Sequence, residues 1–299
     1  MSEWLISLEG TEAGHQAALG LALLAALLHA IFGALQKGRF DPWLSRWSID
    51  CWLACLSLPM VFLVPWPEPH MWPIFAGMVV IHFVYKVLMA MAFSRGAFTV
   101  VYPVVRGSGP LFTVVGAWLI FGETFAPLQW LGLFVLLAGI FGLAVYNFLF
   151  LEAERDTLGP ALIFALLTGF MVALYTTYDA YGIRATANPF TFLAWFFFLS
   201  ALDFSLLVPM VMRHRFRGVT LRPLLQRGLI GALVAYGSFG SVMLATRLDK
   251  VGEAAVLRET STVFAAIIGW LVLKETVGPR RIALMALIAA GAVIVELAG

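Results

Sequence analysis

Charged residues are scarce in this sequence. Only 12% of its 299 residues are Asp, Glu, Lys or Arg, whereas 62% are hydrophobic, and the mean hydropathy is +0.93. A soluble domain of this length could not bury so much apolar surface. Apolar runs of about 20 residues, the length that crosses a bilayer, recur along the whole chain. We therefore expect an all-α integral membrane protein with the lipid bilayer as its surroundings.

Other absences narrow the function. The net charge of only +2 indicates no nucleic-acid partner. The two cysteines, Cys51 and Cys55, lie one helical turn apart without a cluster of further Cys or His, so they are interpreted as packing residues, and we expect no metal and no cofactor. A Walker A motif is missing, which disfavours an ATP-driven motor, and neither H-E-x-x-H nor G-x-S-x-G occurs, which disfavours an enzyme. Residues 1–15 contain no Lys or Arg, so the first apolar run is expected to be a retained helix rather than a signal peptide.

The apolar runs divide the chain into two halves of five spans each. The halves are 1–150 and 151–299, and the polar stretch 151–157 joins them. Five is an odd number, so the two halves are expected to enter the membrane with opposite orientation. The expected spans are 16–36, 47–65, 71–93, 97–121, 128–150, 158–182, 189–211, 224–246, 253–273 and 279–297.

An internal repeat supports this division. Residues 95–139 align without a gap on residues 247–291, and 11 of the 45 aligned pairs are identical, where composition alone gives roughly 3–5. The matched pairs include Arg106 with Arg258, Trp118 with Trp270, and Pro127 with Pro279. Internal repeats in a membrane protein are typical of secondary transporters, whose binding site lies between the repeats.

Basic residues in the loops predict the orientation. Thirteen of them fall on one side of the ten expected spans, whereas only Arg184, Arg247 and Lys250 fall on the other. The positive-inside rule then makes the basic side cytoplasmic. We expect a multi-pass protein of the plasma or inner membrane with both termini outside.

Charges within the spans are the first candidates for function, because a charge in the bilayer is costly. Lys86 follows His82 by one turn and lies beside Tyr85, and Arg106 and Arg258 occupy matching places in the two halves. Pro103 and Pro110 predict a broken helix over 97–121 that faces a cavity, where Arg106 either binds a polar ligand or pairs with an acidic side chain for structural reasons. No corresponding break is expected near Thr262.

Further candidates are carboxyl and aromatic groups. Glu259 is a candidate for carrying a coupling proton or for a salt bridge to Arg106 or Lys86, and Asp179 is a second, weaker coupling candidate. Tyr102 and Tyr175 lie deep enough to contact a ligand, together with Tyr85. Glu123 and Glu275 are interpreted as caps of the helix that follows each. Asp50 and Asp203 have no obvious partner.

The two motifs resemble those of a known family. Tyr102-Pro-x-x-Arg106-Gly-x-x-Pro110 followed by Glu123, and Leu257-Arg-Glu-Thr-Ser261 followed by Lys274-Glu-Thr276, look like the motifs of EamA-type members of the drug/metabolite transporter superfamily. The resemblance covers nearly the whole chain. It implies a ten-helix secondary carrier with a central cavity and leaves the substrate open.

The residues and the resemblance together predict a transporter that exports a small metabolite by alternating access. The expected substrate is an amino acid or another carboxylate, bound by Lys86, Arg106 and Arg258 and contacted by Tyr85, Tyr102, Tyr175 and His82. Proton coupling is possible, and the carrier is expected to be a monomer or a homodimer. Alternatives are a broad-specificity exporter of lipophilic cations and an exchanger of sugar phosphates or nucleotide sugars. A channel or a membrane-embedded enzyme fits the sequence least well.

Overall fold

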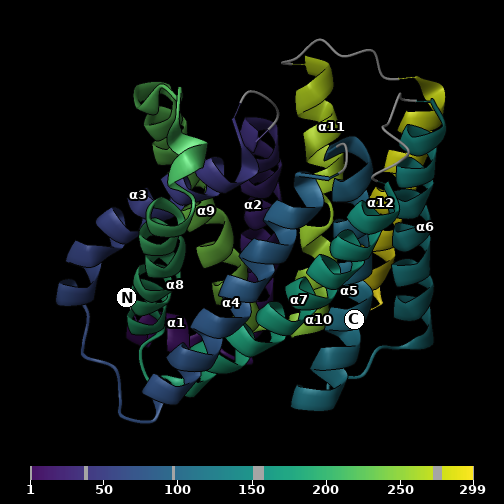
Figure 1. The fold of residues 1–299 in the computed structure, drawn as a ribbon. Coiled ribbons are helices and arrows are strands. Elements are labelled where there is room, and N and C mark those ends of the chain that lie inside the picture. The colour runs from purple at the N-terminus through teal and green to yellow at the C-terminus, as the bar shows by residue number, and fades with distance from the viewer. Residues whose placement is uncertain (1, 37–39, 96–97, 151–157, 272–277, 299) are drawn as a thin grey trace.

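The structure, a computed structural model, describes residues 2–36, 40–95, 98–150, 158–271 and 278–298. In this part of the chain the regular elements are α-helices and one 3₁₀ turn, which confirms the all-α prediction (Figure 1). The elements are α1 (Ser2–Ser7), α2 (Glu12–Gln36), α3 (Pro42–Leu63), α4 (Met71–Phe93), α5 (Phe98–Phe121), α6 (Pro127–Phe150), α7 (Leu158–Ala185), α8 (Pro189–Val211), η1 (Arg213–Phe216), α9 (Leu221–Leu248), α10 (Val251–Arg258), α11 (Ser261–Leu271) and α12 (Pro279–Leu297).

The helices α2 to α9 are each long and apolar enough to cross a membrane. The broken helix α10–α11 and the shorter α12 complete the ten spans. Large apolar side chains cover the outside of the bundle; Leu119, for example, is 68% exposed. Such a surface is stable against lipid tails and not against water, so the protein is a multi-pass membrane protein.

Local sequence signals set several helix starts. The Asp41 carboxylate accepts a hydrogen bond from the Trp43 N–H (2.8 Å), and Pro42 occupies the first turn of α3. Asn188 caps α8 in the same way, with Pro189 in the first turn. A short polar side chain followed by proline suits a helix start, because the side chain supplies an acceptor to the orphan N–H groups and proline, which has no N–H, leaves one orphan donor fewer.

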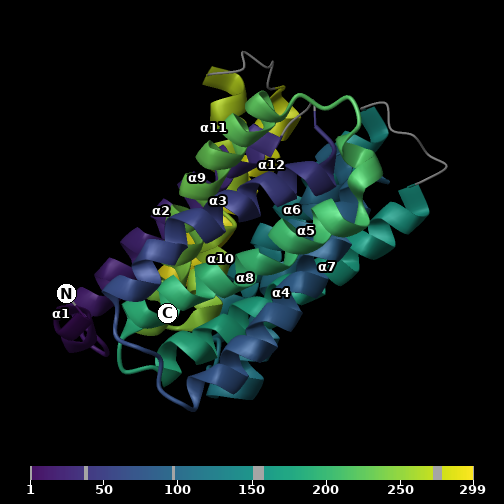
Figure 2. The same cartoon turned by 60° about the vertical axis from the view of Figure 1, so that its left-hand side comes forward.

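Helix pairing follows an approximate twofold symmetry between the two halves. Packing of α2 on α9 corresponds to packing of α7 on α4, and packing of α5 on α7 corresponds to packing of α10 and α11 on α2. The pairs α6–α12 and α3–α8 each join a helix to its own counterpart in the other half. Most of the extensive contacts therefore join one half to the other, as two inverted repeats require (Figure 2).

The α6–α12 pair has the closest backbone approach among these contacts. A Cβ atom on Gly291 would lie 2.5 Å from the Leu136 nitrogen, and one on Gly132 would lie 2.8 Å from the Gly291 carbonyl oxygen. Both distances are shorter than van der Waals contact, so the helices meet backbone to backbone. Small residues permit this packing in membranes, where association depends on close contact rather than on hydrophobic burial.

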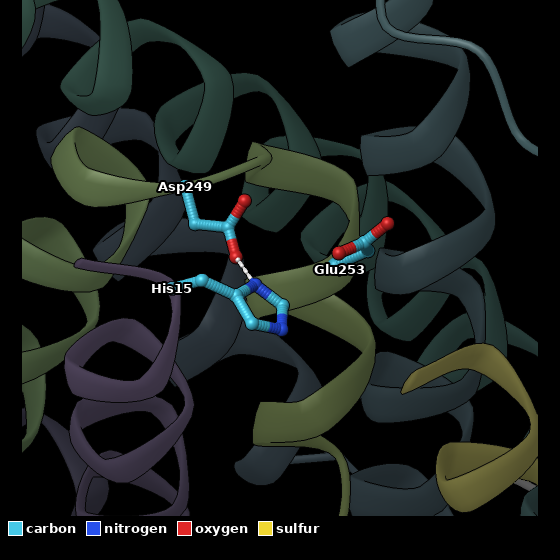
Figure 3. Close-up of side chains that lie close together, drawn as sticks. All are labelled: His15, Asp249 and Glu253. Atoms are coloured by element: carbon cyan, nitrogen blue, oxygen red, sulfur yellow. Dashed lines mark hydrogen bonds and ion pairs between the residues drawn. The ribbon is translucent and has the colours of Figure 1, made fainter. Parts of the chain in front are cut away.

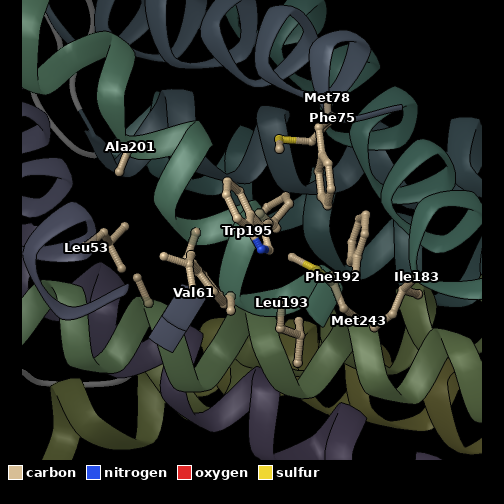
Figure 4. Packing of buried hydrophobic residues seen from close by; sticks show 14 of the residues in the cluster. Leu53, Val61, Phe75, Met78, Ile183, Phe192, Leu193, Trp195, Ala201 and Met243 are labelled. Atoms are coloured by element: carbon tan, nitrogen blue, oxygen red, sulfur yellow. The ribbon is translucent and has the colours of Figure 1, made fainter. Parts of the chain in front are cut away.

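The largest apolar core joins α3, α4, α7, α8 and α9. In Figure 4 the Phe75 and Phe192 rings stand between Met78 and Ile183, and these two rings are stacked with their centroids 5.6 Å apart. Trp195 lies beside them, with Val61 of α3 and Met243 of α9 closing the cluster. This core packs one side of the bundle tightly and leaves the polar groups described below between the remaining helices.

The expected position of the helix break was wrong. Helix α5 continues from Phe98 to Phe121 through Pro103 and Pro110, whereas the matching helix of the second half ends at Arg258 and restarts at Ser261. At the break the Thr262 N–H donates to the Glu259 carbonyl (3.0 Å) instead of the Arg258 carbonyl, and Arg106 Nη2 donates to the Arg258 carbonyl instead (3.3 Å). An inserted side chain is a known cause of helix interruption, so the cause is a tertiary contact and not proline.

The bundle has two distinct ends. Figure 1 shows both termini in the lower half of the bundle, whose lower end we call the terminal face; this end carries α1 and the α3–α4 and α5–α6 connections. The opposite end, the basic face, carries the starts of α3, α9 and α12 and the end of α4.

Candidate functional site

The centre of the bundle holds an ion pair between the two motifs. Arg106 on α5 lies 2.8 Å from Glu259 Oε1 at the break between α10 and α11, and the two side chains are 4% and 2% exposed. Arg106 Nη2 also donates to the Ser261 hydroxyl at 3.2 Å. Tyr102, one turn earlier on α5, interacts with Ser261 as well. The salt bridge expected for Glu259 is thus present, with Arg106 and not with Lys86 as its partner.

Arg258 behaves differently from its counterpart Arg106. Its side chain is 3% exposed, and no Asp or Glu of the described residues lies within ion-pair distance of it. Its Nε, like that of Arg106, lacks a hydrogen-bond partner among those residues. Arg258 lines a cavity of about 10 Å³ together with Tyr175, Thr176 and Asp179 of α7. A buried guanidinium without a counter-charge is energetically unfavourable unless something else compensates it.

A carboxylate–imidazole pair with aromatic neighbours borders this region. Asp179 Oδ2 lies 2.9 Å from His82 Nε2, and both side chains are buried. The ring centroid of Tyr175 lies 4.8 Å from that of His82 and 4.9 Å from that of Tyr85. The structure therefore brings His82, Tyr85 and Tyr175 together, next to the cavity of Arg258.

Lys86 lies in a second, separate cluster. Its ammonium group donates to Asp50 (2.8 Å), to Asp203 (2.6 Å) and to the Ser200 carbonyl. Arg46 lies 2.8 Å from the other oxygen of Asp50. An ammonium group has three N–H donors, so these three acceptors saturate Lys86.

Sequence reasoning missed most of this second cluster. Asp50 and Asp203 had no assigned partner, because Lys86 is 36 and 117 residues away along the chain. A signal was present: each of α3, α4 and α8 carries buried charge within an apolar span, and Arg46 and Asp50 are spaced four residues apart on one helix. Opposite charges on neighbouring spans are expected to pair in a bilayer.

A third polar cluster lies at the terminal face (Figure 3). Figure 3 shows the His15 ring of α2 pointing toward Asp249, and Nδ1 lies 2.5 Å from Oδ2. Glu253 stands nearby and lies 2.8 Å from both Lys250 Nζ and Gln129 Nε2. The hydrogen bond to Glu253 raises the pKa of Lys250, although partial burial opposes this effect. The potential metal ligands His15, Asp249 and Glu253 lie within 4.8 Å of one another, but protein donors already engage the carboxylates, so we interpret the cluster as a link between α2 and α10.

The expectation that Glu123 caps the helix that follows it was wrong. Its two carboxylate oxygens accept hydrogen bonds from the N–H groups of Val251 (2.8 Å) and Gly252 (3.0 Å). It therefore caps α10 of the other half and not α6, the helix that follows it in sequence. The favourable position of a carboxylate at a helix N-terminus explains the contact. The matching Glu275 lies outside the described residues.

Comparisons with known proteins agree with this architecture. One solved crystal structure is similar over 96% of this chain and 99% of its own, with a TM-score of 0.72 and 16% sequence identity, which supports the fold alone. No curated protein sequence shows significant similarity. The model of the EamA-like transporter family matches twice, over residues 16–145 and residues 159–297. These two matches cover most of the sequence, so the chain belongs to the EamA-like transporter family.

Proposed function

We propose that this protein is a secondary active transporter that exports a small carboxylate, such as an amino acid, by alternating access. The observation that carries the proposal is Arg258, a buried guanidinium without an acidic partner among the described residues. Charge in the bilayer is retained for function, and arginine binds carboxylates with paired hydrogen bonds. A substrate carboxylate would supply the direct ion pair that no described Asp or Glu makes with Arg258.

The neighbouring groups have complementary roles in this proposal. Arg106 positions the break between α10 and α11, so that Arg258 sits at the end of a helix. Tyr85, Tyr102 and Tyr175 contact the body of the substrate, whereas Lys86 is held by Asp50 and Asp203 and does not bind it directly. Because the two inverted repeats meet at these residues, rocking one repeat against the other would expose the site to each side in turn.

Proton coupling belongs to the same proposal. The His82–Asp179 pair and Glu259 are buried groups that can exchange protons, and both lie near Arg258. We place the carrier in the plasma or inner membrane with its termini outside, on the strength of the basic residues at the opposite face.

A second function is favoured by two specific atoms. Asp179 Oδ1 and Glu259 Oε2 lack hydrogen-bond donors among the described residues. Free carboxylate oxygens would suit a lipophilic cation, as in a broad-specificity exporter. The two proposals differ in the sign of the charge on the ligand, so one experiment separates them.

The test is thermal stabilisation of the purified protein in detergent by a panel of ligands. It contains amino acids, organic acids, sugar phosphates and lipophilic cations, because a ligand that binds only the folded state raises the melting temperature. Stabilisation by carboxylates that disappears in Arg258→Gln and persists in the exposed control Arg95→Gln would support the carboxylate transporter. Stabilisation by cations alone, lost in Glu259→Gln or Asp179→Asn, would refute it.

A further inference from the structure

The structure contains a larger cavity that is separate from the small space at Arg258. It has a volume of about 300 Å³ and lies between the start of α3 and the end of α4, toward the basic face. Its polar lining includes Arg46, Lys86, Tyr85 and Ser45, and its apolar walls include Phe40 and Phe93. This volume is at the lower end of the range for ligand sites in proteins, about 300–1,000 Å³. It therefore suits a small molecule.

The charge of the cavity wall has one sign. Arg46 and Lys86 line the cavity, whereas no acidic residue is found among its described lining residues. The two carboxylates of this cluster lie behind the cations: the Asp50 side chain is 0% exposed and that of Asp203 is 8% exposed. A ligand in the cavity would meet the cations first, so the wall favours an anion.

Counting donors identifies which cation is available. Lys86 already donates to Asp50, Asp203 and the Ser200 carbonyl, which uses all three of its N–H groups. Arg46 has five N–H groups, and its one ion pair within the described residues is made by Nη2 with Asp50. Its side chain is 20% exposed and borders the cavity. Arg46 therefore retains donors that can bind a carboxylate.

We propose that this cavity binds a small carboxylate with an aromatic or apolar body, and that Arg46 holds the carboxylate while the Phe40 and Phe93 walls contact the body. The proposal rests on the proposed transport function and adds to it a second site, an anchoring residue and the character of the substrate. Tyr85 lines this cavity and packs against Tyr175, which borders the Arg258 cavity. The cavity is thus a site that a substrate occupies before or after Arg258, with Tyr85 and Tyr175 between the two.

The test measures binding of 3-phenylpropionate to the full-length protein in detergent by isothermal titration calorimetry. The matched probes are 3-phenylpropionamide, which keeps the body without the charge, and 2-phenylethylamine, which reverses the charge. We expect the carboxylate to bind, and the amide and the amine to bind at least tenfold more weakly. Equal binding of the amide or the amine, or no binding of the carboxylate, would overturn the proposal.

Two variants and a control locate the site. Arg46→Gln should weaken 3-phenylpropionate binding at least tenfold, and Met89→Trp, which fills the cavity without changing any charge, should weaken it as much. Arg215→Gln is the control, because Arg215 pairs with Asp41 at the same face (2.5 Å) but does not line the cavity. Unchanged affinity in either Arg46→Gln or Met89→Trp would refute the assignment.

A parallel measurement separates this proposal from the transport function. If 3-phenylpropionate shows no Arg46-dependent binding while another carboxylate binds in an Arg258-dependent manner, the transport proposal stands and the second site is refuted. If carboxylate binding depends on neither arginine, both proposals fail.

Discussion

The ion pair between Arg106 and Glu259 allows a quantitative prediction about stability. Arg106→Met removes the charge and leaves Glu259, 2% exposed, without its partner at 2.8 Å. Breaking a buried ion pair by removing one partner costs about 3–5 kcal/mol. The substitution also removes hydrogen bonds to the Arg258 carbonyl and the Ser261 hydroxyl, each worth about 0.6 kcal/mol between membrane helices. We expect the free energy of unfolding to fall by about 4–6 kcal/mol in total.

The assay is unfolding in mixed micelles by sodium dodecyl sulfate, followed by circular dichroism, for the single variants and for Arg106→Met/Glu259→Gln. Replacing both members of a buried pair is often nearly neutral, so the double variant should recover at least about 2 kcal/mol relative to the sum of the singles. Arg95→Met serves as the control, because Arg95 is exposed and its contacts within the described residues are with the Phe164 ring and its own helix. Additivity of the two single changes within about 0.5 kcal/mol would show that the two side chains do not interact and would refute the predicted role of the ion pair.

Three further predictions concern packing, capping and pH. Gly291→Ala should separate α6 from α12 and destabilise the protein by about 1–3 kcal/mol, whereas Gly20→Ala, where a Cβ meets nothing within 4 Å, should be neutral or stabilising; equal melting temperatures would contradict this. Glu123→Ala should cost about 0.5–2 kcal/mol by uncapping α10, measured by the same unfolding assay, and a wild-type value would contradict the capping role. Burial raises the pKa of Glu68, but hydrogen bonds from the Ala187 N–H and a neighbouring hydroxyl outweigh this effect and lower the pKa overall. A lowered pKa adds stability above the unfolded-state pKa, and this stability is lost as the pH falls through the folded-state pKa. Glu68→Gln should therefore make the melting temperature less sensitive to acid, and an unchanged pH profile would contradict this prediction.

Much of the fold could be predicted because it depends on local properties of the sequence. The expected spans 71–93 and 189–211 coincide with α4 and α8, since hydropathy fixes the length of a span and Pro189 marks a helix start. The break in α10–α11 could not be predicted in this way. No proline or glycine occurs between Arg258 and Thr262, and the interruption arises from Arg106, 152 residues away.

The same distinction between local and tertiary information applies to the site. Lys86 and Arg258 gave the same sequence signal, a basic residue within an apolar span, and both are buried, at 2% and 3% exposure. Their surroundings are opposite, because Lys86 has two carboxylates and a carbonyl as acceptors whereas Arg258 has no acidic partner among the described residues. Hydropathy identifies which charges are buried, but a ligand responds to the charge that remains after pairing. That remainder depends on helices that meet only in the folded bundle. Arg258 and Arg46 therefore keep N–H groups without partners among the described residues, whereas Lys86 does not.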